Sequence, residues 1–335
     1  MRARPNVCMV GYGMMGGWHS EGLKRAQCTL HTAVGPNPEK LAAFAAKYRY
    51  QKNAADLAAA LADPEIDIVI LASPTEFHAA QAIQSIEAGR ATLVEIPIAL
   101  SLADAERVVD LAERRSVPLG VVHPMRFRPE RAPAIERIGK KQERVTHAHG
   151  RLFIHRLVNI GASGYKRSWT DNILWHHAAH LVDLGLWMLT GGMMADADER
   201  VRHVHSNYPP PDPRTGIPME IVIVAETYEH QTVAVTGSYY ATTRIYDTLV
   251  VTDRDSYRLD ELAATLTTGE GVARVASEQA NAELVAPEFV DAVRAGRDPF
   301  VPGWSVLPTM RILQKVQDDW DERNGAQSIP GRPLS

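Results

Sequence analysis

Three polar side chains recur along an otherwise apolar stretch, SWTDNILWHHAAHLVDLGLWML, residues 168–189. His176 and His180 are four residues apart, and Asp183 follows three residues later. In a helix these spacings place all three side chains on one face. An unpartnered buried charge is unfavourable by several kcal/mol, so the stripe indicates mutual hydrogen bonds or a ligand.

Three interpretations of this stripe are open. The histidines could be satisfied core residues, or the i, i+4 pair could bind a metal ion with the aspartate. In the third interpretation a histidine takes a proton from a substrate hydroxyl near neutral pH, and the aspartate fixes its tautomer. The candidate catalytic residues are then His180, His176, His177 and Asp183.

The helix that carries the stripe is expected to be buried, because its apolar residues run nearly all round. Thr170 or Asp171 can cap its beginning, and Gly191-Gly192 can end it.

A glycine-rich turn follows the first apolar run, in VCMVGYGMMGGWHSEGLKRA, residues 7–26. In such a motif the first glycine permits the tight turn, the second lets the backbone approach a pyrophosphate, and the third lets the helix pack on the strand. The N–H groups at the helix N-terminus then face the phosphates. The expected cofactor contacts are Gly11, Gly13, Met14, Met15 and Gly16.

Strands and helices alternate after this turn. The strands are expected at 30–34, 67–72, 91–96 and 118–122, and helices at 38–48 and 102–115. This alternation is typical of a parallel sheet with helices on both faces. We therefore expect an α/β chain with an NAD(P)-binding Rossmann domain over residues 1–125.

Beyond HPMRF, residues 123–127, strands of alternating polarity predominate and predict an open, largely antiparallel sheet. We expect an α+β domain over residues 126–335 that binds substrate, closed by helices at 286–300 and 304–322. Because a broad antiparallel sheet often forms a subunit interface, we also expect a homodimer or higher homo-oligomer.

The choice of nicotinamide cofactor depends on the residues after the second strand. NAD-binding chains carry an acid there that bonds the ribose 2′-hydroxyl. Here AVGPNPEK, residues 33–40, offers Asn37 and no acid before Glu39. Lys40 would attract a 2′-phosphate, so we expect NADP, with NAD as the alternative. Hydride transfer to a nicotinamide needs no metal, so we expect no metal and favour the acid–base interpretation of the stripe.

Two further strand ends offer cofactor contacts, since ligands bind beyond the carboxyl ends of parallel strands. The candidates are Ser73, Pro74, Thr75, His78, Glu95 and Pro97. For His78 a cofactor contact and a cap on the next helix are equally good interpretations.

Composition excludes other classes of function. A net charge of -4 gives no reason to expect a nucleic-acid partner. No apolar run is long enough for a membrane span, and no signal peptide precedes Gly11, so we expect a cytoplasmic protein. Two cysteines, Cys8 and Cys28, do not make a disulfide framework.

Positive charge is concentrated in one segment. Residues 126–180 contain eight Arg and three Lys against three Glu and one Asp, a net +7, together with six of the 13 histidines. A solvated basic face is one interpretation, and a pocket for a small anionic substrate is the one that we favour. The candidate substrate contacts are His123, Arg126, Arg156, Arg167 and Trp169.

Nearly the whole chain resembles the glucose-fructose oxidoreductase/inositol dehydrogenase (Gfo/Idh/MocA) family. The resemblance lies in the glycine motif, in PTEFH (74–78), in EAGRATLVEIP (87–97) and in the helix with His180 and Asp183. It implies an NAD(P)-dependent oxidoreductase that acts on a CH–OH group. Most members have Glu-Lys-Pro at the strand end, with a catalytic lysine, and an aspartate four residues before the histidine. Ile96 and His176 stand at those two places here.

EIP together with RSWTDNILWHHAAHLVDL, residues 167–184, resembles a narrower branch, the 4-carboxy-2-hydroxymuconate-6-semialdehyde dehydrogenases of protocatechuate 4,5-cleavage. That resemblance implies oxidation of an anionic cyclic hemiacetal to 2-pyrone-4,6-dicarboxylate. Arginines would bind the two carboxylates of this substrate. The alternatives are a sugar or cyclitol dehydrogenase of the same family, or a catalytically silent NADP-binding protein.

Overall fold

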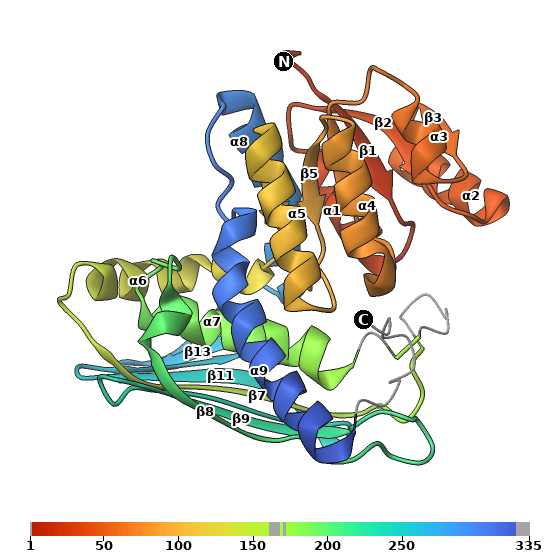
Figure 1. The fold of residues 1–335 in the computed structure, drawn as a ribbon. Helices are drawn as coiled ribbons and strands as arrows, with labels where there is room; N and C mark the ends of the chain where they lie inside the picture. Colours follow the sequence, from red (N-terminus) through yellow and green to blue (C-terminus); the bar gives the residue numbers. More distant parts are fainter. Residues whose placement is uncertain (1, 161–167, 170–171, 326–335) are drawn as a thin grey trace. The chain divides into compact units, whose positions relative to one another are not determined.

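The computed structural model describes residues 2–160, 168–169 and 172–325 (Figure 1). The described chain divides into two compact units. The first holds residues 2–127, 160 and 279–304, and the second holds residues 128–159, 168–169, 172–278 and 305–325.

The first unit is built on six parallel strands in the order β3-β2-β1-β4-β5-β6. Their bounds are β1 Asn6–Val10, β2 Thr29–Val34, β3 Lys52–Ala54, β4 Ile68–Leu71, β5 Ala91–Val94 and β6 Leu119–Val121. The chain runs outward from β1 to β3 and then returns to place β4 on the other side of β1. Such a reversal opens a crevice at the carboxyl ends of the strands, where ligands bind.

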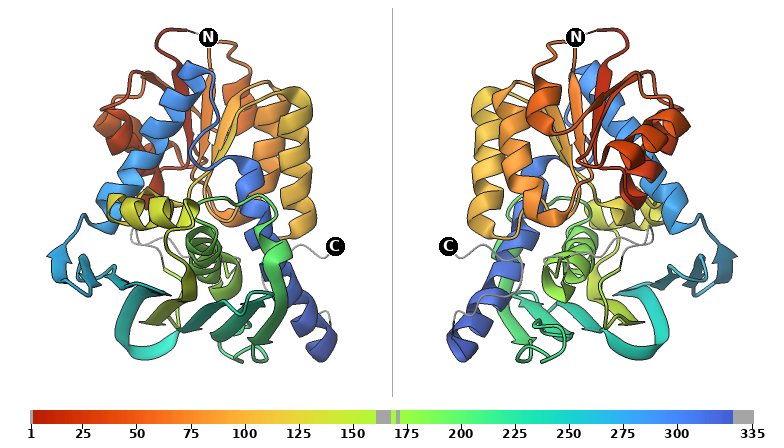
Figure 2. Two further views of the ribbon diagram at one scale, coloured as in Figure 1. Left: turned by 90° about the vertical axis from the view of Figure 1, so that its left-hand side faces the viewer. Right: turned by 90° about the vertical axis from the view of Figure 1, so that its right-hand side faces the viewer.

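Helices cover both faces of this sheet (Figure 2). They are α1 Met14–Leu23, α2 Pro38–Tyr48, α3 Leu57–Leu61, α4 His78–Glu87, α5 Leu102–Arg115 and α8 Glu278–Ala295. Leu23 of α1, Phe44 of α2 and Phe289 of α8 share one hydrophobic cluster with Met9 and Ile70 of the sheet. The helices α4 and α5 pack together on the other face.

The division of the chain differs from our expectation at its C-terminal end. We expected one domain to run from 126 to 335, but residues 279–304 belong to the first unit. The physical reason is apolar burial, since Val285 and Phe289 of α8 are at most 2% exposed within the core of that unit. The amide of Val121 also donates to the carbonyl of Val301, which ties the end of this segment to β6.

The second unit is built on an eight-stranded sheet in the order β14-β13-β12-β11-β7-β10-β9-β8. Its strands are β7 Val145–His155, β8 Val201–Asn207, β9 Glu220–Thr227, β10 Thr232–Ser238, β11 Tyr240–Thr252, β12 Ser256–Asp260, β13 Thr265–Thr268 and β14 Gly271–Arg274. Neighbouring strands are antiparallel except for β7 and β10. The expected fold class is thus confirmed.

Helices lie on one face of this sheet (Figure 1). They are α6 Ala132–Gly139, α7 Ala179–Leu189 and α9 Leu307–Asn324. The helix α7 approaches the sheet very closely, because a Cβ added at Gly150 would lie 2.7 Å from Cβ of Leu181, and one at Gly185 would lie 2.4 Å from Cγ1 of Val233. Glycine is required at both contacts for this reason.

The stretch that carries the histidines is not one regular α-helix. Residues Ile173–Ala178 form a π-helical turn that leads into α7. Our expectation that Thr170 or Asp171 caps this stretch falls outside the described residues, and the cap is instead Asn172, whose Oδ1 accepts from the amides of Leu174 and Trp175. The expected glycine end is confirmed, with positive φ at Gly191 and Gly192.

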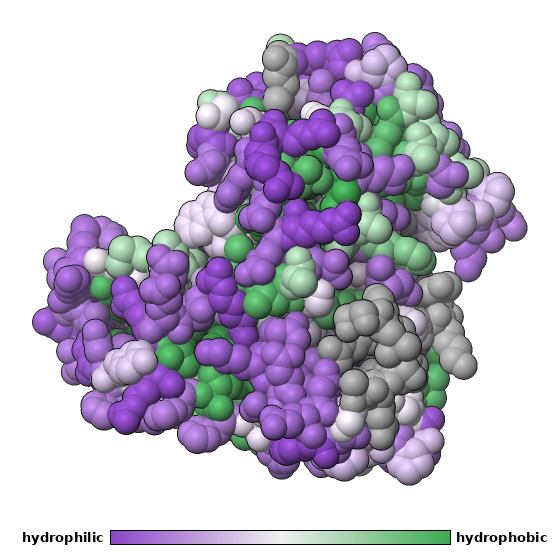
Figure 3. Space-filling view, in the orientation of Figure 1, coloured by the Kyte–Doolittle hydropathy of each residue, from purple (hydrophilic) through white to green (hydrophobic). Residues whose placement is uncertain are grey.

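The long helix α9 is amphipathic, with one buried apolar side and one hydrophilic side. Its buried side includes Met310, Leu313 and Val316, whereas the surface over its C-terminal half is mostly hydrophilic (Figure 3). No helix in the described part of the chain is both long and apolar enough to cross a membrane.

Candidate active site

The glycine turn between β1 and α1 has the shape that a dinucleotide needs. Gly11 has φ +106°, and a Cβ there would lie 2.3 Å from the carbonyl oxygen of Ala72. A Cβ at Gly16 would lie 2.2 Å from the carbonyl oxygen of Gly11, so both positions exclude side chains. A Cβ at Gly13, by contrast, meets no described atom within 4 Å. Open space at this position, before the N–H groups of α1, fits a pyrophosphate.

Met14 and Met15 form the first turn of α1, where backbone N–H groups lack partners within the helix. Asn37 lies beyond the end of β2, and its Oδ1 accepts from the amide of Lys40 at 2.9 Å. Asn37 therefore caps α2, and residues 36–40 are exposed.

Residues 73–78 lie beyond the carboxyl end of β4, with Pro74 exposed and Thr75 half-buried. The hydroxyl of Ser73 donates to Oε1 of Gln81 at 2.6 Å. His78 is buried at the start of α4, and its side chain makes no cap there. Its Nδ1 lies 2.7 Å from the carbonyl oxygen of Pro97, and its Nε2 lies 3.0 Å from that of Ser73. His78 thus joins the ends of β4 and β5.

A second buried histidine supports the end of β5. Nε2 of His19, from α1, donates to Oε1 of Glu95 at 2.7 Å, and both residues are buried. The sequence analysis selected Glu95 and missed His19, although His19 lies three residues after the last glycine of the motif. The structure therefore adds His19 as the residue that holds this carboxylate.

Two candidate substrate residues belong to the first unit. His123 follows β6 and is 2% exposed, and Arg126 lies in the short helix Pro124–Phe127 and is 3% exposed. Both side chains are therefore largely shielded from water.

In the second unit the three histidines form one cluster. The ring centroid of His176 lies 4.4 Å from that of His177 and 5.6 Å from that of His180, and both contacts are edge-to-face. The three rings are half-buried, whereas Trp175, Ala178 and Ala179 beside them are buried. The predicted spacing of His176 and His180 on one side of the helix is consistent with this contact.

Tyr239 extends the cluster, and the sequence analysis missed it. Its hydroxyl lies 2.7 Å from Nδ1 of His177, and it accepts from Nη1 of Arg156 at 3.3 Å. The guanidinium of Arg156 lies over the rings of Tyr239 and Trp169, at 5.4 and 5.8 Å from their centroids. Arg156 also donates to Oδ1 of Asn159 at 2.5 Å. The structure thus brings two predicted substrate residues, Arg156 and Trp169, beside the histidines.

Asp183 has a partner on a different helix. Its Oδ1 accepts from the hydroxyl of Thr309 in α9 at 3.1 Å, and the residue is 1% exposed. This hydrogen bond links α7 to α9. The orientation of a histidine by Asp183 stays a prediction.

Most arginines of the basic segment form structural ion pairs. The pairs are Arg128 and Arg131 with Glu261, Arg137 with Glu143, Arg144 with Glu229 and Arg151 with Asp247. Burial opposes ionisation of Asp247, but hydrogen bonds from Arg151 and Arg258 outweigh it and lower the pKa of this carboxyl. The net charge of the segment therefore overstates the positive charge that is available to an anionic ligand. Arg167 lies outside the described residues.

Comparison with known proteins gives separate family matches for the N-terminal and C-terminal parts of the chain. Residues 5–123 match the family described as "Oxidoreductase family, NAD-binding Rossmann fold", and residues 134–266 match "Bacterial oxidoreductases, C-terminal". The 4-carboxy-2-hydroxymuconate-6-semialdehyde dehydrogenase of Sphingobium sp. (strain NBRC 103272 / SYK-6) is 30% identical over 323 residues, which are 93% of this chain and 97% of that protein.

Two solved structures are similar along most of the chain. Levoglucosan dehydrogenase in complex with NADH and levoglucosan has a TM-score of 0.80 and 16% identity, over 96% of this chain and 98% of that chain. GenD2 from gentamicin A biosynthesis, in complex with NAD, has a TM-score of 0.77 and 21% identity, over 96% of each chain. These two similarities establish the fold. Together with the family matches and the Sphingobium relative, they identify the chain as an oxidoreductase of the Gfo/Idh/MocA family with an NAD-binding Rossmann domain.

Proposed function

We propose that the protein is a cytoplasmic NADP-dependent dehydrogenase of protocatechuate 4,5-cleavage. It oxidises the cyclic hemiacetal of 4-carboxy-2-hydroxymuconate-6-semialdehyde to 2-pyrone-4,6-dicarboxylate. The observation that carries this proposal is the cluster of the three histidines with Tyr239 and Arg156, which combines proton acceptors with a cation. The Sphingobium relative, similar over nearly its whole length, supports the choice of substrate.

In the proposed reaction His180 takes the hydroxyl proton of the hemiacetal. A bound nicotinamide cofactor supplies the hydride acceptor, and loss of hydride and proton together turns the hemiacetal carbon into a lactone carbonyl. Histidine suits this proton transfer because its ordinary pKa lies near neutrality. His177, hydrogen-bonded to Tyr239, binds the substrate, His176 shares the base role, and Asp183 orients a histidine.

Two carboxylates on the substrate need cationic partners. Arg156 is one of the three arginines that we assign to them, and it stacks on Tyr239 and Trp169 beside the histidines. Arg126, Arg167 and His123 complete the proposed set. A guanidinium binds a carboxylate through two parallel hydrogen bonds, which orients the ring as well as attracting it.

The proposed cofactor contacts are the residues of the glycine turn, Asn37 and the two strand ends. The exposed residues 36–40 include Lys40 and leave room for a 2′-phosphate. His78 and His19 act behind these contacts, by holding the strand ends in place.

Two other functions compete with this proposal. The levoglucosan complex of a structural relative favours a sugar or cyclitol dehydrogenase. Replacement of the usual catalytic lysine by Ile96 favours a catalytically silent NADP-binding protein. Neither alternative explains a stacked arginine beside the histidines as well as an acidic substrate does.

Replacement of His180 tests the proposed base. We expect His180→Asn to reduce kcat by ~10²-fold or more, because general-base catalysis contributes about that factor. His230→Asn is the matched control, since His230 lies in an exposed turn with positive φ, which asparagine adopts readily. Near-normal turnover of His180→Asn in a steady-state assay of reduced nicotinamide would contradict the assignment.

A substrate panel tests the substrate class. We expect turnover of ring-cleaved protocatechuate and little turnover of myo-inositol, hexoses or levoglucosan. Arg156→Gln should raise KM for the dicarboxylate by roughly 10- to 100-fold, the usual value of a hydrogen bond to a charged group. Arg202→Gln, on the exposed side of β8, is the control. Faster turnover of a neutral polyol would instead support a sugar dehydrogenase, and no turnover at all would support the silent protein.

The cofactor choice is tested by comparing kcat/KM for NADP and NAD. We expect NADP to be preferred, and Lys40→Gln to reduce that preference about fivefold, as for an exposed ion pair. Lys47→Gln, at the other end of α2, should leave it unchanged. A clear preference of the unmodified protein for NAD rejects this part of the proposal.

We propose that the face of the second sheet opposite α7 forms a homodimer. Alternation along the strands places Val222, Val224 and Leu249 on that face, where each is at least partly exposed. We expect light scattering to give twice the chain mass of 36.9 kDa. Val224→Lys should yield monomers, and Leu284→Lys, on the exposed side of α8, should not. A monomeric unmodified protein refutes this interface.

A further inference from the structure

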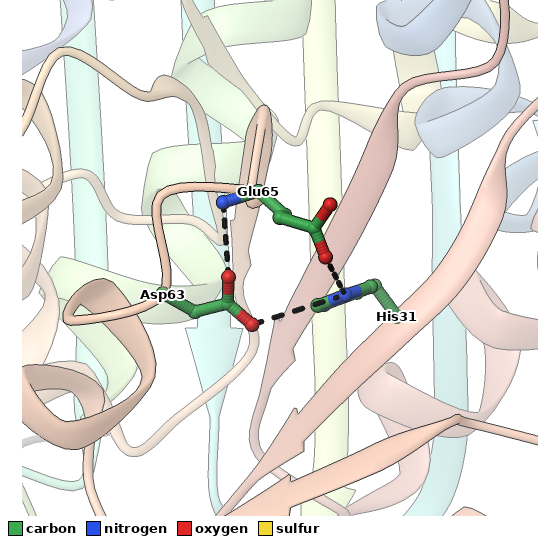
Figure 4. A group of neighbouring side chains, drawn as sticks. All are labelled: His31, Asp63 and Glu65. Atoms are coloured by element: carbon green, nitrogen blue, oxygen red, sulfur yellow. Dashed lines mark hydrogen bonds and ion pairs between the residues drawn. The ribbon is translucent and has the colours of Figure 1, made fainter.

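A second group of side chains in the first unit has the composition of a metal site. His31 lies in β2, and Asp63 and Glu65 lie in the loop between α3 and β4. Nε2 of His31 is 3.9 Å from Oδ2 of Asp63 and 3.9 Å from Oε2 of Glu65. One atom from each residue lies within 4.8 Å of the other two (Figure 4).

The histidine is held in an orientation that suits a ligand. His31 is 2% exposed, and its Nδ1 lies 2.9 Å from the hydroxyl of Thr32. When Nδ1 donates to this hydroxyl, Nε2 carries the lone pair that a metal ion requires. Neither carboxylate forms a hydrogen bond to Nε2, because 3.9 Å is too long for one. A buried polar side chain is thus aimed at two carboxylates that it does not reach.

The carboxylates are also arranged toward the histidine. Oδ1 of Asp63 accepts from the amide of Glu65 at 2.9 Å, which fixes the carboxylate and turns Oδ2 toward His31. Lys52 donates to Oδ2 of Asp63 at 2.6 Å, and this hydrogen bond lowers the pKa of Asp63. Asp63 is therefore ionised at neutral pH. A metal ion would compete with Lys52 for Asp63 and with Arg2, whose Nη2 lies 3.7 Å from Oε1 of Glu65.

We propose that His31, Asp63 and Glu65 form a site for a divalent transition metal, with Zn²⁺ as its preferred ion. Zn²⁺ binds nitrogen and carboxylate oxygen at about 2.0–2.2 Å, so tetrahedral ligand atoms lie roughly 3.4 Å apart. Each carboxylate oxygen then moves by about 0.5 Å toward Nε2, and the two oxygens, which lie within 4.8 Å of each other, also move closer together. The side chain of Glu65 is 56% exposed and that of Lys52 is 51% exposed, so both are able to shift. Water completes the coordination.

The position of this site separates it from the proposed chemistry. Asp63 and Glu65 precede the amino end of β4, whereas the glycine turn follows the carboxyl end of β1. In a parallel sheet the amino ends of the strands lie on the side opposite to their carboxyl ends. The metal would tie the loop before β4 to β2 and stabilise the first unit, because a ligand that binds only the folded state adds to stability. We expected no metal from the sequence, and separations of 32 and 34 residues from the histidine match no local metal motif.

Titration of the purified, chelator-treated full chain with Zn²⁺ or Co²⁺ tests the site. We expect a 1:1 isotherm in calorimetry, tetrahedral Co²⁺ absorption bands, and a Zn²⁺-dependent rise in Tm. His31→Gln should abolish all three signals. Glu65→Gln should weaken binding at least about tenfold, and Lys52→Met should tighten it about fivefold by removing the competing ammonium.

His180→Asn is the matched control, because His176 and His180 form the other pair with metal-ligand spacing. Binding that persists in His31→Gln, or that is lost in His180→Asn, overturns the proposal. Absence of binding by the unmodified protein at millimolar Zn²⁺ does so as well. If His31→Gln does not fold, Glu65→Gln gives the decision, since its side chain is exposed and unchanged affinity there overturns the site.

Discussion

The close packing of α7 on the second sheet is the constraint on which the candidate site depends. Gly150 and Gly185 let helix and sheet approach so closely that a methyl group at either position would collide with Leu181 or Val233. The helix cannot rotate or slide without creating such a collision. The π-helical turn before it is therefore held in place, and with it the direction of His176 and His177.

Several arginines of the second unit form ion pairs with carboxylates of the same unit. Asp247 pairs with both Arg151 and Arg258, and Glu261 pairs with Arg128 in the interior. Removing one partner of such a buried pair leaves an uncompensated charge, so these arginines are needed for structure. The guanidinium of Arg156 lies over the rings of Tyr239 and Trp169, and it donates to the Tyr239 hydroxyl and to Oδ1 of Asn159.

The first unit supports its cofactor edge with buried histidines. His78 links the segments after β4 and β5, and His19 holds the carboxylate of Glu95. Neither role can be read from a strand-end motif, because Pro97 lies 19 residues after His78 and Glu95 lies 76 residues after His19. The motif does predict where the loops are, and the buried hydrogen bonds explain how the loops keep their shape.

The sequence by itself determined the local elements with strong, repeated signals. The helices α2 and α5 begin and end where their patterns predict, because Asn37 and Ser101 cap them and their apolar residues recur at helical spacing. The glycine turn was readable because its conformation and its close contacts exclude side chains. The strands β12 to β14 are not indicated by the sequence pattern, since they are short, are mostly half-exposed or exposed and carry little alternation.

Only the tertiary structure decided which distant residues meet. It assigned α8 to the first unit, brought Tyr239 to His177, and placed Asp63 and Glu65 against His31. Contacts of this kind depend on how the elements pack together, and packing between distant elements produces no periodic pattern in the sequence. Motif and spacing therefore predicted the type of chemistry, whereas the partners that position each group came from the fold.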